Sequence, residues 1–387
     1  MRRTIFTDEH QALREAFGSY LDKEVAPVYD DWEHAGLIPR EVLRQWGRLG
    51  FLGPAVPEQY GGAGADDFRF NTVLLEEAAE RGFIGVEMAI SVHSDVALPY
   101  MLELGDPEQK ERWLPGMANG DVIAGIAMTE PSTGSDVASI GTRARKSNGN
   151  YIVSGAKTFI SNGINADAII TAVRTGTTGR PSDISLLMIE DGMPGFTRGR
   201  NLDKLGSHSQ DTAELFFDEV EVPGENLIGE EGRGFAYLMQ NLAQERLAIA
   251  VASVAAARGA LARTLDYVKE RSAFGRPVGT FQNSRFKLAA CHGEAQVTTA
   301  HVDAAIAAHV RGELSAEDAA VAKWWATEAQ GRIIDACLQL HGGYGYMMEY
   351  PIARSYADAR IKRILGGTSE IMLELVGRSL GLADPRV

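Results

Sequence analysis

The stretch LQLHGGYGYMMEYPIARSYADARIKRILGGTSEIM, residues 338–372, interrupts helical sequence with two glycine clusters. These clusters are HGGYG at 341–345 and GGT at 366–368. Because glycine has no Cβ and tolerates positive φ, each cluster lets the backbone pass close to another segment or to a ligand. Helix-like sequence follows each cluster, and its first N–H groups are free to bind an anion. Taken alone, the pattern favours helix–helix turns with glycine C-caps, so the rest of the chain must decide.

The sequence before this stretch is helical as far back as about residue 234. Its patterns predict three long helices, at about 235–272, 283–311 and 316–341, and shorter ones after Tyr350 and Thr368. Long helices with short connections are typical of a four-helix bundle. We therefore predict a C-terminal helical bundle domain over residues 234–387.

Residues 123–233 differ in character, because apolar and polar residues alternate there and β-branched residues are frequent. Short strand-like segments, such as YIVSGAKTFISNG at 151–163 and TAELFFDEVEVP at 212–223, are separated by turn-forming residues. Such closely spaced strands predict a compact antiparallel barrel or sandwich, and the lack of strand–helix–strand alternation argues against a doubly wound dinucleotide fold. Residues 1–122 again have helical patterns. The predicted fold is therefore α+β, with helical, β and helical domains in that order.

The composition is that of an ordinary globular protein, with 45% hydrophobic and 23% charged residues among 387. A formal net charge of −14 argues against a nucleic-acid or membrane-surface binder, which needs a basic field. We see no apolar run of membrane-spanning length and no signal or transit pattern at the N-terminus. We therefore expect a bacterial cytoplasmic location, or the mitochondrial matrix if the chain is eukaryotic and already processed.

The spacing of cysteines and histidines predicts no metal site. Cys291 and Cys337 lie in predicted helices without metal-ligand spacing, so we expect buried, reduced thiols. Five histidines have no nearby cysteine or carboxylate pattern that would make them ligands: His93, His292, His301, His309 and His341.

Two loops of the β segment carry groups that suit a flat heterocyclic ligand. AMTEPSTGSDVAS at 127–139 offers the hydroxyls of Thr129 and Ser135 among small residues that leave room for a ring. FISNG at 159–163 places the ring of Phe159 beside the hydroxyl of Ser161 at a strand end. Each loop by itself is more typical of a hairpin turn or of core packing.

The combination of motifs is far more specific than its parts. MTEPSTGSD, FISNG, RSAFGRPVGTFQ, QLHGGYGYMMEYP and GGTSEIM follow one another in this order along the chain. Together they resemble the acyl-CoA dehydrogenase family over essentially the whole length. The resemblance implies FAD as the cofactor, bound between the β domain and the C-terminal bundle.

The resemblance also assigns residues to the isoalloxazine ring of FAD. It places Met128, Thr129 and Ser135 beside the ring, and Phe159 and Ser161 at its other edge. Many relatives have Trp at the position of Phe159, and stacking on the ring should survive that change.

The adenosine diphosphate part of FAD is held partly by a neighbouring subunit in this family. Its contacts map onto Arg271, Phe274, Gln282, Gln339 and Gly343. Arg271 suits a charge-assisted pyrophosphate contact, and Gly343 suits a close backbone approach. Thr368 and Glu370 would line the same cofactor.

The implied reaction is α,β-desaturation of an acyl-CoA thioester. A carboxylate removes the α-proton while the β-hydride passes to flavin N5. The developing enolate oxygen needs fixed donors, and the family supplies a ribityl hydroxyl and one backbone N–H, which falls here at Gly366. Most members carry the base at that position, but a glycine cannot abstract a proton. The chain is therefore either an inactive relative or one whose base lies elsewhere.

NLAQERLAIA, residues 241–250, resembles the long-chain form of the family, whose base lies on the first C-terminal-domain helix. Glu245 is the matching residue. Helical spacing supports this assignment independently, because apolar residues occur at −7, −3, +4 and +7 from it: Leu238, Leu242, Ile249 and Ala252. A carboxylate on an apolar stripe is seldom found unless it is paired or functional. Arg246 maps to a CoA contact, and the substrate would also meet Ser135 and Gly366.

Three functions remain open from the sequence. The first is a dehydrogenase for long or branched acyl-CoA in fatty-acid β-oxidation, a homotetramer (a dimer of dimers) that passes electrons to an electron-transferring flavoprotein. The second is a flavin monooxygenase or nitroalkane-oxidase-like relative. The third is a non-catalytic scaffold, which only Gly366 favours. None of these needs a nucleic acid or a membrane as partner.

Overall fold

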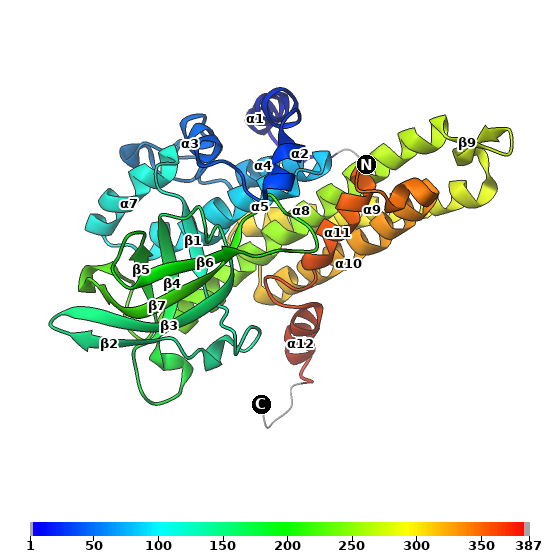
Figure 1. Cartoon of the computed structure of the whole chain (residues 1–387). Helices are drawn as coiled ribbons and strands as arrows, with labels where there is room; N and C mark the ends of the chain where they lie inside the picture. Colours follow the sequence, from blue (N-terminus) through cyan, green and yellow to red (C-terminus); the bar gives the residue numbers. More distant parts are fainter. Residues whose placement is uncertain (1–2, 383–387) are drawn as a thin grey trace.

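The computed structural model describes residues 3–382, and it confirms the predicted helical–β–helical order (Figure 1). The β sheet lies at one end of the molecule. The long C-terminal helices extend away from it, and the N-terminal helices cover their near part (Figure 1). This arrangement leaves α8, Gly234–Glu270, running from the sheet to the far end of the molecule.

The N-terminal domain consists of helices that end mostly at glycines: α1 Asp8–Tyr20, α2 Tyr29–Ala35, α3 Arg40–Arg48, α4 Phe68–Arg81, α5 Ile84–Ser91, α6 Leu98–Leu104 and α7 Pro107–Asn119. Thr7 is the N-cap of α1 and forms a capping box with His10. Between α5 and α6 the helix passes through a π-helical segment, η3, at Val92–Ala97. Most side chains of η3 and of the first half of α6 are buried, so this continuous helix is the centre of the domain.

His93 joins this central helix to the β domain. Its Nδ1 accepts the Ala124 N–H at 3.0 Å, so Nε2 carries the proton and donates to the Met117 carbonyl at 3.0 Å. Burial lowers the pKa of His93 to about 4, so the ring is neutral. This histidine is therefore structural.

Eight strands form the sheet of the middle domain: β1 Ala124–Ala127, β2 Arg143–Ser147, β3 Asn150–Ser161, β4 Ala168–Arg174, β5 Ile184–Glu190, β6 Phe196–Asn201, β7 Thr212–Val222 and β8 Leu227–Ile228. The strand order is β6-β7-β3-β2-β4-β5-β8, with β1 beside β4. The sheet is mainly antiparallel, as predicted, but β1 and β4 pair in parallel, as does a single residue pair of β2 and β4. Between β1 and β4 the chain passes through β2 and β3, which are antiparallel to each other. The strand β4 therefore runs in the same direction as β1 and β2.

The C-terminal domain has three long helices, whose bounds lie close to the predicted ones: α8, α9 Gln282–Val310 and α10 Ala316–His341. A hairpin of β9 Ser272–Ala273 and β10 Arg276–Pro277 joins α8 to α9. The shorter α11, Pro351–Ile361, packs along α10 and α8, and α12, Ser369–Ser379, packs on α10. The predicted four-helix bundle thus consists of the three predicted long helices and the shorter α11, which lies after Tyr350 as predicted.

The helix α8 packs against α4, α9, α10 and η3. By length and hydropathy alone it would be long enough to cross a membrane, which corrects the expectation that no apolar run reaches that length. However, 78% of its most apolar window is buried inside the protein, as expected for a core helix. Both cysteines are also buried and unpaired, as predicted.

Close packing at α8 depends on small residues. A Cβ on Gly259 would lie 1.9 Å from the carbonyl oxygen of Glu80, the penultimate residue of α4. We therefore expect Gly259→Ala to lower the free energy of unfolding by about 1–3 kcal/mol, because α4 and α8 must move apart. Thermal and urea unfolding would measure this change.

The control is Gly293→Ala on α9, where a Cβ would meet nothing within 4 Å. That substitution should be neutral or stabilise by about 0.5–1 kcal/mol, since alanine favours helix more than glycine. Equal effects of the two substitutions would contradict the packing argument.

Candidate active site

Glu245 is buried in the middle of the molecule. It lies on α8, with 5% of its surface exposed, and its Oε1 accepts a hydrogen bond of 3.1 Å from the Tyr100 hydroxyl of α6. Burial raises the pKa of Glu245 to about 7, although the Tyr100 hydroxyl and the Arg246 guanidinium each lower it. Of the predicted apolar stripe, Leu238 and Ala252 are buried, and Leu242 and Ile249 are partly buried. This carboxyl group can therefore exchange a proton near neutral pH.

The glycine loop before α12 lies against the same helix. Gly366 and Gly367 have φ values of +64° and +93°, which only glycine adopts without strain. The guanidinium of Arg246 lies 3.5 Å from the Gly366 carbonyl oxygen, and the Lys323 ammonium donates to the Gly367 carbonyl at 2.6 Å. Within residues 3–382, no acceptor receives the N–H of Gly366. Two cations thus hold the loop and leave one backbone donor free.

A side chain at position 366 would require Ile249 to move. A Cβ there would lie 2.4 Å from Cδ1 of Ile249, one helical turn after Glu245 on α8. The positive φ adds backbone strain for any L side chain. The backbone at 366 therefore favours glycine.

Sequence reasoning missed the buried lysines of this region. Lys323 has no exposed surface, and burial lowers its pKa to about 8, with the charges of Arg246 and Lys362 lowering it further. Lys362, on the turn that follows α11, forms a buried ion pair of 2.7 Å with Glu87 of α5. The sequence feature that could have revealed Lys323 is its place within the apolar run AAVAKWWA of α10, at residues 319–326.

The loop after β1 contains the predicted residues Met128, Thr129 and Ser135. Hydrogen bonds from β3 hold the start of this loop in place. Lys157 of β3 donates to the Met128 carbonyl and to the Glu130 carboxylate, both at 2.9 Å. Burial lowers the pKa of Lys157 to about 8, while the charge of Glu130 raises it. The buried pair fixes the start of the loop, and the hydroxyl-bearing part at Ser135 is exposed.

The side chain of Phe159 lies on the surface and is not packed in the core of the β domain. It has φ +60°, sits at an irregularity in the pairing of β3 with β7, and is 68% exposed. A left-handed conformation is unusual for an aromatic residue, and such strain concentrates at functional sites. Ser161 ends the same strand. An exposed aromatic face beside a hydroxyl loop fits a planar ring such as a flavin.

The remaining predicted cofactor residues lie at the other end of the chain's long helices. Arg271, Gln339 and Gly343 line one groove with a volume of about 540 Å³. Phe274, at the tip of the β9–β10 hairpin, is 96% exposed, and Gln282 is exposed at the start of α9.

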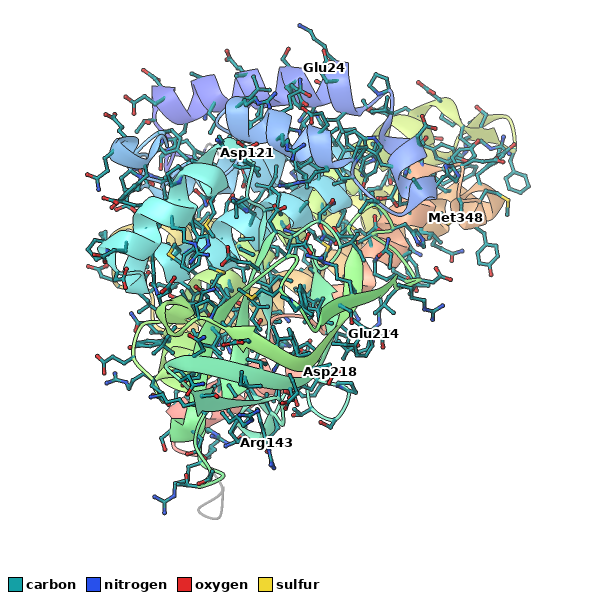
Figure 2. All side chains as sticks on the ribbon, turned by 60° about the vertical axis from the view of Figure 1, so that its left-hand side comes forward. Glu24, Asp121, Arg143, Glu214, Asp218 and Met348 are labelled. Atoms are coloured by element: carbon teal, nitrogen blue, oxygen red, sulfur yellow. The ribbon has the colours of Figure 1, made fainter. Side chains whose placement is uncertain are left out.

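In Figure 1 this hairpin lies at the end of the molecule opposite the sheet. Met348, close to the groove in sequence, is likewise far from Arg143 of β2 in Figure 2. A single chain therefore does not bring the two sets of predicted residues together.

Thr368 and Glu370 lie at the start of α12. Thr368 is its N-cap and accepts the Ile371 N–H at 3.3 Å, and Glu370 is exposed in the first turn. Among the residues that the structure describes, no group of three or more His, Cys, Asp or Glu side chains could hold a metal ion.

Comparison with known proteins identifies relatives over the whole chain. Residues 7–121, 125–220 and 232–381 match the N-terminal, middle and C-terminal domain families of acyl-CoA dehydrogenases. The long-chain specific mitochondrial acyl-CoA dehydrogenase of Mus musculus is 43% identical over 380 residues, covering 98% of this chain and 88% of that protein.

Solved structures have the same fold. An acyl-CoA dehydrogenase from Geobacillus kaustophilus is 45% identical, with a TM-score of 0.94, and the match covers 98% of this chain and 100% of that one. A glutaryl-CoA dehydrogenase from Mycobacterium smegmatis, in complex with FADH2, is 26% identical, with a TM-score of 0.90 over 97% of this chain and 95% of that one.

The contact between Tyr100 and Glu245 predicts how the carboxyl group titrates. We expect Tyr100→Phe to raise the pKa of Glu245 above its value of about 7, because the substitution removes a hydrogen bond that stabilises the carboxylate. Infrared difference titration would measure this, with Glu245→Gln assigning the carboxyl band.

Tyr267→Phe is the control, because that hydroxyl donates to the His341 carbonyl at 3.3 Å, away from Glu245. A pKa that stays constant or falls in Tyr100→Phe would show that the hydroxyl does not stabilise the carboxylate.

Proposed function

The chain belongs to the acyl-CoA dehydrogenase family, whose reaction is the FAD-dependent dehydrogenation of acyl-CoA thioesters, and we propose that Glu245 is the catalytic base. The observation that carries this proposal is the buried Glu245 carboxyl, with a pKa of about 7, on the helix that also contacts the Gly366 loop. Above pH 7 the carboxylate form predominates and can take the weakly acidic α-proton.

The Gly366 N–H is the protein donor that we assign to the developing enolate oxygen. The carbonyl groups of Gly366 and Gly367 face Arg246 and Lys323, so two buried cations hold the loop that carries this N–H. A fixed donor costs no reorganisation when charge develops, and it acts strongly in a dry site. Glu245 and the Gly366 loop would therefore act on the α-carbon and the thioester oxygen of the same substrate.

The residues present fit FAD. The hydroxyl loop with Thr129 and Ser135, and the exposed face of Phe159, would hold the flavin ring. When bound, FAD supplies the acceptor for the β-hydride. Arg271 and Gly343, in the distant groove, would hold the pyrophosphate of an FAD bound to a second copy of the chain.

We propose a homotetramer on the same grounds. Large apolar side chains are exposed around the distant end of the bundle: Phe274 at 96%, Tyr346 at 85%, Phe286 at 64% and Met348 at 58%. Exposed apolar clusters of this kind are typical of subunit interfaces. An assembly through this end would complete each FAD site with residues of a neighbour.

The substrate that we propose is a long-chain or branched acyl-CoA, because the sequence around Glu245 resembles the long-chain form of the family and a long-chain specific relative is 43% identical. Electrons would pass to an electron-transferring flavoprotein, and the pathway would be fatty-acid β-oxidation. The corresponding location is the bacterial cytoplasm, or the mitochondrial matrix in a eukaryote.

Replacing the base gives the central test. We expect Glu245→Gln to bind FAD and acyl-CoA but to abolish reduction of the flavin, because an amide cannot accept the α-proton. Anaerobic titration with acyl-CoAs of graded length and branching would follow flavin absorbance.

Glu103→Gln, an exposed carboxylate on the same helix as Tyr100, is the control and should be reduced like the unaltered protein. Normal reduction of Glu245→Gln would remove Glu245 as the base. An unaltered holoenzyme that no acyl-CoA reduces would contradict the proposed desaturation.

The distant groove is tested through cofactor retention. We expect Arg271→Ala to weaken FAD binding about tenfold or more, because it removes a charge-assisted contact with the pyrophosphate. Flavin content after gel filtration and FAD titration of the apoprotein would measure the change. Lys269→Ala, on the exposed end of α8, keeps the groove intact and is the control. Equal FAD affinity of both variants would place Arg271 outside the cofactor site.

A further inference from the structure

Lys323 differs from the other buried lysines of the protein in having no carboxylate partner. Lys157 forms an ion pair of 2.9 Å with Glu130, and Lys362 forms one of 2.7 Å with Glu87. Lys323 has no exposed surface and forms no ion pair with any residue in the range 3–382. Burying a charge is costly unless it is paired. Its presence in the core therefore requires an explanation other than stability.

The ammonium group of Lys323 contacts the glycine loop before α12. Its Nζ donates to the Gly367 carbonyl at 2.6 Å, and this is the one hydrogen bond that it makes within the described part of the chain. On the other side of the loop, Nε of Arg246 lies 3.5 Å from the Gly366 carbonyl oxygen. Lys323 thus makes the shorter of the two contacts between a cation and this loop.

The helix α10 also holds both ends of the loop. Glu328, on the same helix as Lys323, accepts the Ser369 hydroxyl at 2.9 Å and forms an ion pair of 3.6 Å with Arg363. The two glycines lie between these attached residues, and glycine backbone changes conformation easily when no contact holds it. Within this segment, the bond from Lys323 to Gly367 joins the glycines themselves to α10.

The surroundings of Lys323 weaken its hold on the proton. Burial lowers the pKa of Lys323 to about 8, and the charges of Arg246 on α8 and Lys362 after α11 lower it further. The charges of Glu328 on α10 and Glu370 on α12 act in the opposite direction. Lys323 is therefore charged below about pH 8 and neutral above it. The helix α9 packs against the same part of α10 with apolar residues: Val302, Ala305 and Ile306.

We propose that protonated Lys323 is a positioning residue for the desaturation, because it holds the loop in the conformation that offers the Gly366 N–H to the thioester oxygen. This inference deepens the proposed function and rests on it, since it takes that N–H as the donor to the developing enolate. A neutral amine donates a weaker hydrogen bond than an ammonium group. When Lys323 loses its proton, the loop is held less firmly and the enolate is stabilised less.

Two groups then limit the reaction from opposite sides of the pH range. Glu245, with a pKa of about 7, must lose its proton to act as the base, so the rate rises through pH 7. Lys323, with a pKa of about 8, must keep its proton, so the rate falls above pH 8. The expected pH profile is bell-shaped, with its maximum between the two values.

The first test measures the rate of flavin reduction by acyl-CoA in the FAD-loaded protein, across a pH range that spans both pKa values. Lys323→Gln keeps an N–H donor and removes the group that titrates, so the fall at alkaline pH should disappear. Lys323→Met removes both the donor and the charge, and we expect it to slow reduction about tenfold or more. Affinity for acyl-CoA, measured in the Glu245→Gln background, should change little, because positioning acts on the reaction step.

The control is Lys204→Gln. Lys204 is a partly buried lysine that donates to the Gln210 carbonyl at 2.7 Å, and burial lowers its pKa as well. It lies in the loop between β6 and β7. This variant should keep both the rate and the fall at alkaline pH.

The second test observes the hydrogen bond to the substrate without turnover. Acyl-CoA labelled with carbon-13 at the thioester carbonyl is bound to Glu245→Gln, in which the base cannot titrate, and infrared spectroscopy records the carbonyl stretch. We expect this stretch to move to higher wavenumber as the pH passes about 8, because the bond from the Gly366 N–H weakens. Adding Lys323→Gln should remove the pH dependence.

Two results would overturn this inference. One is that the fall at alkaline pH persists in Lys323→Gln, and the other is that the carbonyl stretch in Glu245→Gln does not change with pH. If Lys323→Met does not fold, these two results still decide, because neither depends on that variant. Failure of the proposed function is distinct, since it would appear as no flavin reduction in the unaltered holoenzyme at any pH, or as normal reduction of Glu245→Gln.

Discussion

Close packing around α8 is the constraint on which the rest of the structure depends. The helix is enclosed by α4, α9, α10 and η3, and alanines and glycines along it allow the backbones to approach. At Gly259 the approach leaves no room even for a methyl group. A single carboxylate, Glu245, stands on this enclosed surface, and removal of water from it raises its pKa to the neutral range. The chemistry of the site is thus a direct consequence of how tightly the helix is buried.

The same packing bears on position 366. A side chain there would require Ile249 to move, and the left-handed backbone of Gly366 favours glycine over other residues. The loop is then free to offer its N–H, because Arg246 and Lys323 bind its carbonyl groups. Buried cations are costly unless they find acceptors. Here the acceptors are the backbone oxygens of Gly366 and Gly367.

The part of the site in the β domain depends on a strained backbone at Phe159 and on the buried ion pair of Lys157 with Glu130. Lys157 and Glu130 anchor the hydroxyl loop, while the backbone at Phe159 turns an aromatic ring outward at the cost of an unfavourable φ. At the far end of the bundle, apolar side chains such as Phe274 at the hairpin tip are likewise exposed to solvent. Both features make sense for surfaces that meet a cofactor or another subunit rather than solvent.

Local sequence patterns by themselves determined the order of the domains, the limits of helices such as α10 and the apolar stripe that holds Glu245. These features depend on periodicity and on the backbone preferences of glycine and proline, which nearby residues encode. Only the tertiary structure decided the parallel pairing of β1 with β4, the contact of Tyr100 with Glu245 and the hydrogen bond of Lys323 to the Gly367 carbonyl. The residues of these pairs are tens to more than a hundred positions apart. Their meeting depends on how whole helices and strands pack, and no local pattern records that.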